Sequence, residues 1–384
     1  MIYFDNSATT KPYQEVMESF VKVSTDYFGN PSSLHQLGVL SEQLLSQARK
    51  QVAQLLKVKS QEILFTSGGT EGNNLAIKGS ALMYRRRGRH LITTRIEHAS
   101  VKEAMEQLKE WGYEITYLPV NQDGRVSILD VEKAIRPDTI LISIIHVNNE
   151  VGTIQPVHEI GKLIKKYPKI IYHVDYVQGV GKVPLELHEC GIDLCSISGH
   201  KFHGLKGTGA LFIREGLEIS PLFSGGSQEG KIRSGTENVA GMVAMAKAFR
   251  LTLEHQGIYK GAMEKIKEYL RENLEVLPQI NIHTPKTGSA PHILNFSISG
   301  IRGEVFVHAL EEKGIFVSTT SACSSKQFTI SPTLLSMGIP KDLAQSAIRV
   351  SLSYENTLAE AQFLVKSIKE IINQLGEGID KHDI

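Results

Sequence analysis

Strand-like apolar runs alternate with amphipathic segments through the first two thirds of this 384-residue chain. The clearest amphipathic segments, 41–56, 100–111 and 157–167, have apolar residues at helical spacing. Strands that alternate with helices form βαβ units and a mostly parallel sheet. The predicted strands are Glu62–Thr66, His90–Thr94, Glu114–Pro119, Thr139–Val147, Lys169–Val174, Leu194–Ser198 and Ala210–Arg214. The chain is therefore predicted to form an α/β fold with its functional groups at the carboxyl ends of the strands.

The pattern changes after about residue 255, where helices and strands follow one another less regularly. The segments expected there are a long charged helix over 261–276, further ordered segments over 293–299, 304–313, 315–318 and 341–347, and a last helix over 358–375. This order is typical of a smaller α+β lobe. We expect a large domain over residues 16–255 and a small domain over residues 1–15 and 256–384.

Charge and cysteine content restrict the partners and the compartment. Lys and Arg number 42 and Asp and Glu number 41, so no bulk field attracts nucleic acid or an anionic membrane. Three cysteines do not form a disulfide framework and fit a reducing compartment. The N-terminal residues lack the features of a signal peptide, and no apolar run has the length of a bilayer span. We expect a cytoplasmic protein.

Lys201 is the first candidate for chemistry. The apolar run 192–198 stops at Ser198-Gly199-His200-Lys201, and a glycine-rich segment follows. A lysine at the end of a buried strand is desolvated, which lowers the pKa of its amine and suits a Schiff-base lysine. The alternative is an exposed lysine on a surface turn.

Asp175 ends another predicted strand, and Gln178 follows it closely. A carboxylate in this place could keep the ring nitrogen of pyridoxal phosphate protonated, and Gln178 could reach the phenolic oxygen of the ring. Alone, an aspartate after a strand is more often the N-cap of a helix.

Two further segments end at the same predicted sheet edge. The turn 67–74, which contains Gly69 and Thr70, opens a helix and is typical of an anion site, although an ordinary strand–helix turn has the same composition. His98 follows the strand His90–Thr94, where its imidazole could stack on a planar cofactor and move protons. A lone histidine is more often structural.

The second lobe contributes a thiol and a guanidinium. Cys323 lies in the polar run 318–326, which favours an exposed thiol; a nucleophilic thiol must be reachable and partly ionised, and an incidental exposed thiol is the equal alternative. Cys190 and Cys195 lie in an apolar stretch and are expected to be structural; without a CxxC pair, no metal site is expected. Arg349 lies inside a β-rich run, where it could bind a carboxylate ligand or form an internal salt bridge.

Taken together, these residues resemble the cysteine desulfurases of the NifS/IscS type, which are class-V aminotransferases among the fold-type I pyridoxal-phosphate enzymes. The resemblance extends nearly end to end. Its motifs are Tyr3–Thr10, Gly29–His35, Phe65–Asn74, Glu97-His98, Asn148–Gly152, His173–Gln178, Ser198–Lys206, Arg233–Asn238, Ser321–Cys323 and Arg349.

The resemblance implies pyridoxal phosphate as cofactor, a seven-stranded sheet in the large lobe, and a role for each matching residue. Lys201 would hold the cofactor through an imine bond and later carry a proton, while His98 would stack on the ring. Asp175 and Gln178 would bind the ring nitrogen and the phenolic oxygen. The implied phosphate ligands are Gly69, Thr70, Ser198 and His200, with Thr236 from the other subunit. A homodimer is therefore expected, because one protomer could not complete the phosphate site.

The resemblance also implies the reaction. Asn148 and Arg349 would hold the carboxylate of L-cysteine. The Cys323 thiolate would take the substrate sulfur as a persulfide, leaving L-alanine, and the loop 318–326 would move to pass the sulfur to an acceptor protein. Little chain follows the last predicted helix, which favours a tRNA-thiolating enzyme over an iron–sulfur scaffold as acceptor.

Two rival functions use the same residues differently. Another fold-type I enzyme, an aminotransferase or a selenocysteine lyase, would not need Cys323 for its turnover. A non-catalytic nucleotide- or RNA-binding protein would use the basic run Arg85–Arg89, which we interpret instead as a solvated helix end.

Overall fold

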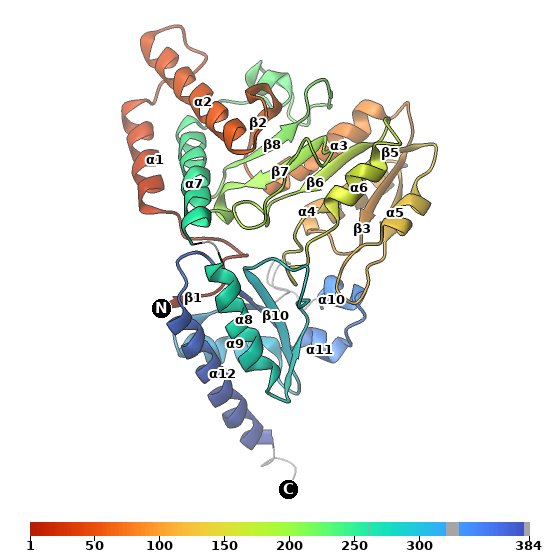
Figure 1. Cartoon of the computed structure of the whole chain (residues 1–384). Coiled ribbons are helices and arrows are strands. Elements are labelled where there is room, and N and C mark those ends of the chain that lie inside the picture. The colour runs from red at the N-terminus through yellow and green to blue at the C-terminus, as the bar shows by residue number, and fades with distance from the viewer. Residues whose placement is uncertain (260, 320–329, 380–384) are drawn as a thin grey trace.

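A seven-stranded sheet forms the centre of the large lobe (Figure 1). The computed structural model describes residues 1–259, 261–319 and 330–379. The strands, in chain order, are β2 (Ile63–Thr66), β3 (His90–Thr94), β4 (Glu114–Leu118), β5 (Thr139–Ile145), β6 (Ile171–Asp175), β7 (Leu194–Ser198) and β8 (Gly209–Ile213). Their spatial order is β2-β8-β7-β6-β5-β3-β4, and only β8 pairs antiparallel, with β2 and β7. The predicted α/β fold with a mostly parallel sheet is confirmed.

The antiparallel strand has a simple cause. Between Ser198 and Gly209 the chain makes a short turn instead of the long helical crossover that a parallel pair requires. The turn begins with the 3-10 helix η2 (Gly199–Lys201), which thereby stands at the carboxyl end of β7.

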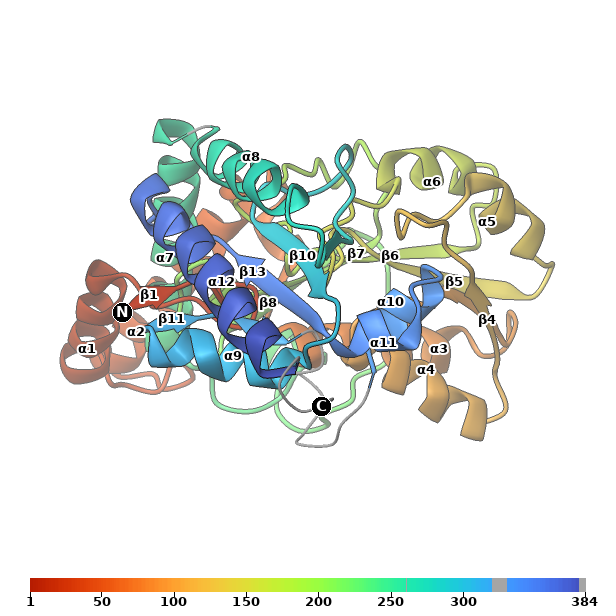
Figure 2. The same ribbon diagram turned by 90° about the horizontal axis from the view of Figure 1, so that it is seen from below.

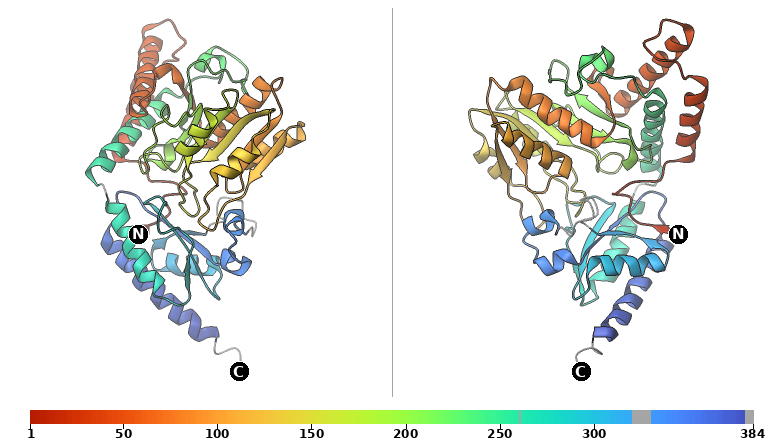
Figure 3. Two further views of the ribbon diagram at one scale, coloured as in Figure 1. Left: turned by 45° about the vertical axis from the view of Figure 1, so that its right-hand side comes forward. Right: turned by 180° about the vertical axis from the view of Figure 1, so that it is seen from behind.

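Helices cover both faces of this sheet (Figure 3). Successive side chains of a central strand pack alternately into the cores beneath the two helical layers. Leu141 packs into the core beneath one helical layer, and its neighbour Ile142 packs into the core beneath the other. The first layer consists of α3 (Gly69–Tyr84) and α4 (Ala99–Glu110). The second contains α1 (Gln14–Asp26), α2 (Gln36–Leu55), α5 (Ile128–Ala134), α6 (Val157–Ile164) and α7 (Val239–Ile258).

The smaller lobe is an antiparallel sheet surrounded by helices (Figure 2). Its strand order is β12 (Ser318–Thr319), β13 (Ala347–Ser351), β10 (Ile293–Ile298) and β9 (Ile280–Ile282). Its helices are α8 (Ala262–Glu275), α9 (Gly303–Glu312), α10 (Pro332–Ser336), α11 (Lys341–Gln345) and α12 (Leu358–Ile379). The N-terminal strand β1 (Ile2–Tyr3) pairs in parallel with β11 (Ile315–Phe316), so both ends of the chain build this lobe.

The lobe contains elements that the sequence prediction did not include or did not separate, among them β1, β9 and α10. The expected segment 315–318 is divided between β11 and β12, which join different sheets. The short strand β9 was missed, since its three residues are too few for a periodic signal.

Some further predictions of the sequence analysis can be compared with the fold, and others cannot. Cys190 and Cys195 are buried, as expected of structural cysteines. Arg85, Arg86, Arg87 and Arg89 are exposed just after α3, which confirms the solvated helix end. Cys323 and most of the loop 318–326 lie outside the described residues, and the domain boundaries stay a prediction. Across the described ranges, no helix combines the length and the apolar character needed to cross a membrane.

Candidate active site

A cavity of about 290 Å³ lies at the carboxyl ends of β5, β6 and β7. Eight predicted site residues line it: Gly69, Thr70, His98, Asp175, Gln178, Ser198, His200 and Lys201. The rest of the lining is Ser7, Ala8, Asn73, Ser100, Ile145, Asn149 and Val177. Because parallel strands end at one edge, residues far apart in the sequence meet there, as the strand-end rule predicts.

Lys201 lines this cavity, so it is not the exposed lysine on a surface turn that was the alternative. Its Nζ donates to the carbonyl oxygens of Ser7 and Ala8 at 2.6 and 2.8 Å. The carbonyl of Lys201 in turn accepts a 2.7 Å hydrogen bond from the buried amine of Lys182. The backbone and the side chain of Lys201 are thus both fixed by neighbouring residues.

Asp175 is held from two sides at the end of β6. Its Oδ1 accepts from the N–H of Val177 at 3.0 Å, and its Oδ2 accepts from Nδ2 of Asn73 at 2.8 Å. Asn73 also donates to Oγ of Ser100 at 2.9 Å. The sequence analysis missed Asn73 and Ser100, although Asn73 lies in the first turns of the helix that follows the glycine-rich segment.

His98 is the N-cap of α4, and its Nδ1 accepts from the N–H of Ser100 at 3.1 Å. This contact assigns the proton of the neutral imidazole to Nε2. Burial lowers the pKa of His98, Asp175 partly opposes the shift, and Lys201 adds to it. The imidazole is therefore neutral at neutral pH.

The start of α3 forms the anion end of the cavity. Gly68 is the N-cap with φ +149°, and Gly69 opens the helix against Val177, whose Cγ2 a Cβ on Gly69 would approach to 2.7 Å. The first N–H groups of a helix are unpaired donors and suit a phosphate. Burial, and after it Lys201, lower the pKa of the nearby His200 to about 4, so its imidazole is neutral.

The donor set fits pyridoxal phosphate. A helix N-terminus, an amine and a carboxylate line one cavity, as a ring with a phosphate, an aldehyde and a pyridine nitrogen requires. Gln178 donates from Nε2 to the carbonyl of Ser7 at 2.9 Å, and its buried Oε1 has no partner among the described residues. The Gln178 amide therefore has spare hydrogen-bonding capacity beside the cavity.

Asn148, expected to hold the substrate carboxylate, does not line this cavity. Its Nδ2 donates to the carbonyl of Ile96, and its Oδ1 accepts from the N–H groups of Glu150 and Val151, each at 2.9 Å. Asn148 is fully buried, and both the nitrogen and the oxygen of its amide already form hydrogen bonds with the backbone. The neighbouring Asn149 lines the cavity instead.

Arg349 and Thr236 also lie outside the cavity lining of this chain. Arg349 is 1% exposed and forms the internal ion pair that the sequence left open, with Oδ1 of Asp5 at 2.9 Å. It also donates to the carbonyl of Asn149, which links it to the cavity wall. Thr236 is exposed in the segment between β8 and α7.

The chain was compared with known proteins. The family model for aminotransferase class-V matches residues 2–364. A NifS/IcsS protein homolog from Lactobacillus delbrueckii subsp. bulgaricus is 48% identical over 98% of this chain and 100% of the relative. A cysteine desulfurase IscS from Dictyoglomus turgidum is 42% identical over 97% of this chain and 95% of the relative. A solved NifS-like protein superposes with a TM-score of 0.92 and 40% identity, covering 97% of this chain and 99% of that one.

These matches extend over nearly the whole chain, and class-V aminotransferases and cysteine desulfurases depend on the cofactor that the cavity fits. The chain belongs to the cysteine desulfurases of the class-V aminotransferase family and is a pyridoxal-phosphate enzyme.

Proposed function

We propose that this cysteine desulfurase transfers the sulfur of L-cysteine to its own Cys323, with Lys201 as the residue that binds the cofactor. The observation that carries the proposal is the convergence of Lys201, His98 and Asp175 on one cavity. We also infer that residues 16–255 form the cofactor lobe and that residues 1–15 and 256–384 form the lobe that carries Cys323.

Each polar group of the cavity has a task in this proposal. Pyridoxal phosphate, when bound, supplies an electron sink for charge that develops at the substrate α-carbon. Asp175, oriented by Asn73, keeps a proton on the ring nitrogen. The amine of Lys201 moves the proton of the α-carbon, and neutral His98 offers a hydrogen bond through Nε2–H. The N–H groups at Gly69 and Thr70, with Ser198 and His200, hold the phosphate.

The substrate carboxylate is assigned to Asn149 and Arg349. The buried Nε of Arg349 has no partner among the described residues, so one donor of the guanidinium is available. A guanidinium and an amide together suit a carboxylate. We propose Asn149 for the role that the resemblance gave to Asn148.

The sulfur transfer step is assigned to Cys323. Its thiolate attacks the substrate sulfur, an S–S bond forms, and the Cβ–S bond of the substrate breaks. The Cβ keeps the electron pair and takes up a proton, so the carbon product is L-alanine and the enzyme holds a persulfide. Neither of the other two cysteines suits this step, because burial raises the pKa of both Cys190 and Cys195.

A homodimer completes the proposal. Large apolar side chains are exposed around the α1–α2 connection, with Phe28 71% and Leu34 99% exposed, and Val39 follows on α2. Such a patch is typical of a protein interface. In the dimer Thr236 of one protomer would bind the phosphate of its partner. We propose that the enzyme is cytoplasmic and that it passes the sulfur to an acceptor protein that serves tRNA thiolation, iron–sulfur cluster assembly, or both.

The test compares two variants with a control. Lys201→Ala should leave no cofactor attached to the chain after borohydride reduction. Cys323→Ala should keep the cofactor, still change its absorbance with L-cysteine, and release no sulfide with dithiothreitol. Cys190→Ala, which alters a buried thiol away from the cavity, should behave as the parent. Sulfide release by Cys323→Ala at the parental rate would contradict the proposal.

A further inference from the structure

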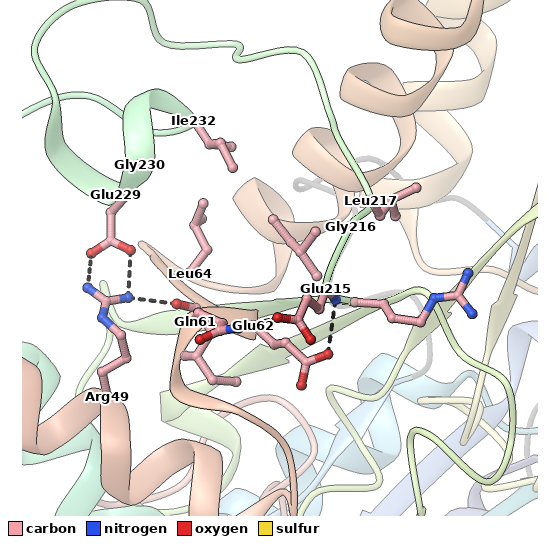
Figure 4. A pocket seen from close by; sticks show the side chains of 13 residues that line it. Arg49, Gln61, Glu62, Leu64, Glu215, Gly216, Leu217, Glu229, Gly230 and Ile232 are labelled. Atoms are coloured by element: carbon pink, nitrogen blue, oxygen red, sulfur yellow. Dashed lines mark hydrogen bonds and ion pairs between the residues drawn. The ribbon is translucent and has the colours of Figure 1, made fainter.

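Arg49 of α2 and Glu229 form a two-pronged ion pair at the edge of the large sheet (Figure 4). The Nη1 and Nη2 atoms of Arg49 donate to the two carboxylate oxygens of Glu229 at 2.8 and 2.6 Å. The Glu229 side chain is 5% exposed, and the Arg49 guanidinium stacks on the ring of Phe65, 4.6 Å from its centre. A two-pronged ion pair that is shielded from water holds α2 and the segment around Glu229 together more firmly than an exposed ion pair would.

The same pair caps the free edge of β2. Arg49 donates to the carbonyl of Ile63 at 2.7 Å, and Glu229 accepts from the N–H of Phe65 at 3.0 Å. Because β2 is the outermost strand of the sheet, these two backbone groups have no neighbouring strand to pair with. Glu229 therefore fixes the segment that carries it, residues 223–238, to the edge of the sheet.

The backbone around Glu229 requires this anchor. Glu229 and Lys231 have φ angles of +45° and +67°, in the left-handed region that non-glycine residues rarely adopt. Such a conformation persists only where surrounding contacts hold it. The Arg49–Glu229 pair supplies contacts of this kind.

A second ion pair ties the same segment to the phosphate turn. The guanidinium of Arg233 donates from Nε to Glu71 at 2.9 Å, and Glu71 accepts from the N–H of Ser67 at 2.9 Å. Burial opposes ionisation of Glu71, but the bonds from Arg233 and Ser67 outweigh it and lower the pKa of the carboxyl. Thr236 follows Arg233 by three residues and is exposed.

We propose that Arg49 and Glu229 are positioning residues for the cofactor site of the partner subunit. They fix the segment 223–238 against β2, and Arg233 fixes it against the phosphate turn, so that Thr236 is presented in a set place to the partner's phosphate. This inference rests on the proposed function, in which Thr236 acts across a dimer. It adds that an ion pair remote from the cavity of its own chain controls cofactor retention in the other chain.

A second cavity lies beside the Arg49–Glu229 pair, and each charged side chain that lines it already has a salt-bridge partner. It measures about 540 Å³, and Arg49, Glu62, Arg214, Glu215 and Glu229 line it. Each of them already has a partner in the described structure: Arg214 pairs with Asp193, Glu215 with Lys59, and Glu62 with His188. The arrangement suits a structural support rather than a second binding site.

Mixed dimers test the inference. One chain carries Lys201→Ala, so only the other chain has a working cofactor site, and two affinity tags isolate the mixed species. Glu229→Gln, which keeps the volume and removes the charge, is placed either on the Lys201→Ala chain or on the working chain. The readout is the rate at which cofactor passes to an excess of cofactor-free parental enzyme, measured as the absorbance left in the mixed dimer after it is recovered through its tags.

When Glu229→Gln lies on the chain opposite the working site, we expect cofactor loss from that site to accelerate about tenfold. The reason is that the hydrogen bond from Thr236 to the charged phosphate is then misplaced. On the working chain the same substitution should change the rate less than about twofold. Arg49→Met should repeat this asymmetry. Lys59→Met, which removes an exposed ion pair in the same corner, should change neither rate.

Thr236→Ala, placed in the same two ways, separates the two levels of the proposal. One outcome is that Thr236→Ala accelerates cofactor loss only when it lies on the chain opposite the working site. If Glu229→Gln then acts equally in both placements, or in neither, the positioning role of Arg49 and Glu229 is wrong. If Thr236→Ala itself has no effect across the dimer, the shared phosphate site is wrong, and the inference is overturned with it.

Discussion

Arg349 in the middle of β13 donates from Nη2 to Oδ1 of Asp5 at 2.9 Å, which joins two residues from opposite ends of the chain. Burial raises the pKa of the Asp5 carboxyl, and the neighbouring guanidinium opposes this shift. The pair lies next to Asn149, whose carbonyl accepts from Nη1 of Arg349. A substrate carboxylate that approaches Arg349 must therefore share the guanidinium with Asp5.

Asp5→Asn and Arg349→Met should change cysteine binding in opposite directions. Asparagine keeps a hydrogen-bond acceptor and removes the competing charge, so KM for L-cysteine should fall. Arg349→Met should raise KM at least about tenfold, because the carboxylate loses its charged partner. Initial rates of alanine formation measure both. An equal rise of KM in the two variants would assign the pair a structural role alone.

Asn148→Ala and Asn149→Ala should separate folding from activity. Asn148→Ala leaves the buried N–H groups of Glu150 and Val151 without an acceptor, which should lower the free energy of unfolding by about 2 kcal/mol or more. Asn149→Ala should leave the urea midpoint nearly unchanged but reduce kcat/KM for L-cysteine about tenfold or more. A stable Asn148→Ala with reduced kcat/KM would restore Asn148 as the substrate ligand.

Glu97→Gln should become increasingly stable relative to the parent as the pH rises. Burial raises the pKa of Glu97 to about 8 from an ordinary value of 4.5, and Thr94 and the N–H of Ile145 only partly oppose the shift. Between these values the folded state holds a proton that the unfolded state has lost, so parental stability falls with pH, by about 1.4 kcal/mol per pH unit at most. Glutamine does not titrate. Urea unfolding at pH 5 and at pH 9 measures the difference, and parallel curves would contradict it.

Iodoacetamide at pH 7.5 should label Cys323 first in the folded protein. Burial raises the pKa of the Cys190 thiol and raises that of Cys195 well above its usual range, so both remain protonated and shielded. Peptide mass spectrometry after short exposure should find label at position 323, and all three cysteines should react in concentrated urea. Comparable labelling of Cys195 without urea would refute the expected order.

The strand ends were the part of the site that the sequence predicted best. Asp175, His98 and Lys201 each follow a run whose period and length indicate a buried strand, and the rule for parallel sheets then brings them together. The rule also indicates the anion end at Gly69, because a glycine-rich turn there opens a helix.

The remaining contacts depend on tertiary packing that leaves no local pattern. Ser7 reaches Lys201 from a segment 194 residues away, and Asp5 reaches Arg349 across 344 residues. Asn148 and Asn149 are the same residue type in adjacent places, and only the path of the turn decides which one lines the cavity. For the same reason Asn73 was missed: its amide matters only because α3 runs past the end of β6.

The pairing of β1 with β11 has a consequence for how the chain is made. Ile2 and Tyr3 align with Ile315 and Phe316, and Asp5 bridges to Ser351, so the two sides of each contact are translated far apart in time. Domains synthesised early can fold while translation continues, but residues 2–5 cannot take their places in the small lobe until residues 315–351 have been translated. Maturation of the lobe that carries Arg349 thus waits for residues 315–351, and Ser7 and Ala8, the carbonyl partners of Lys201, are drawn into place with it.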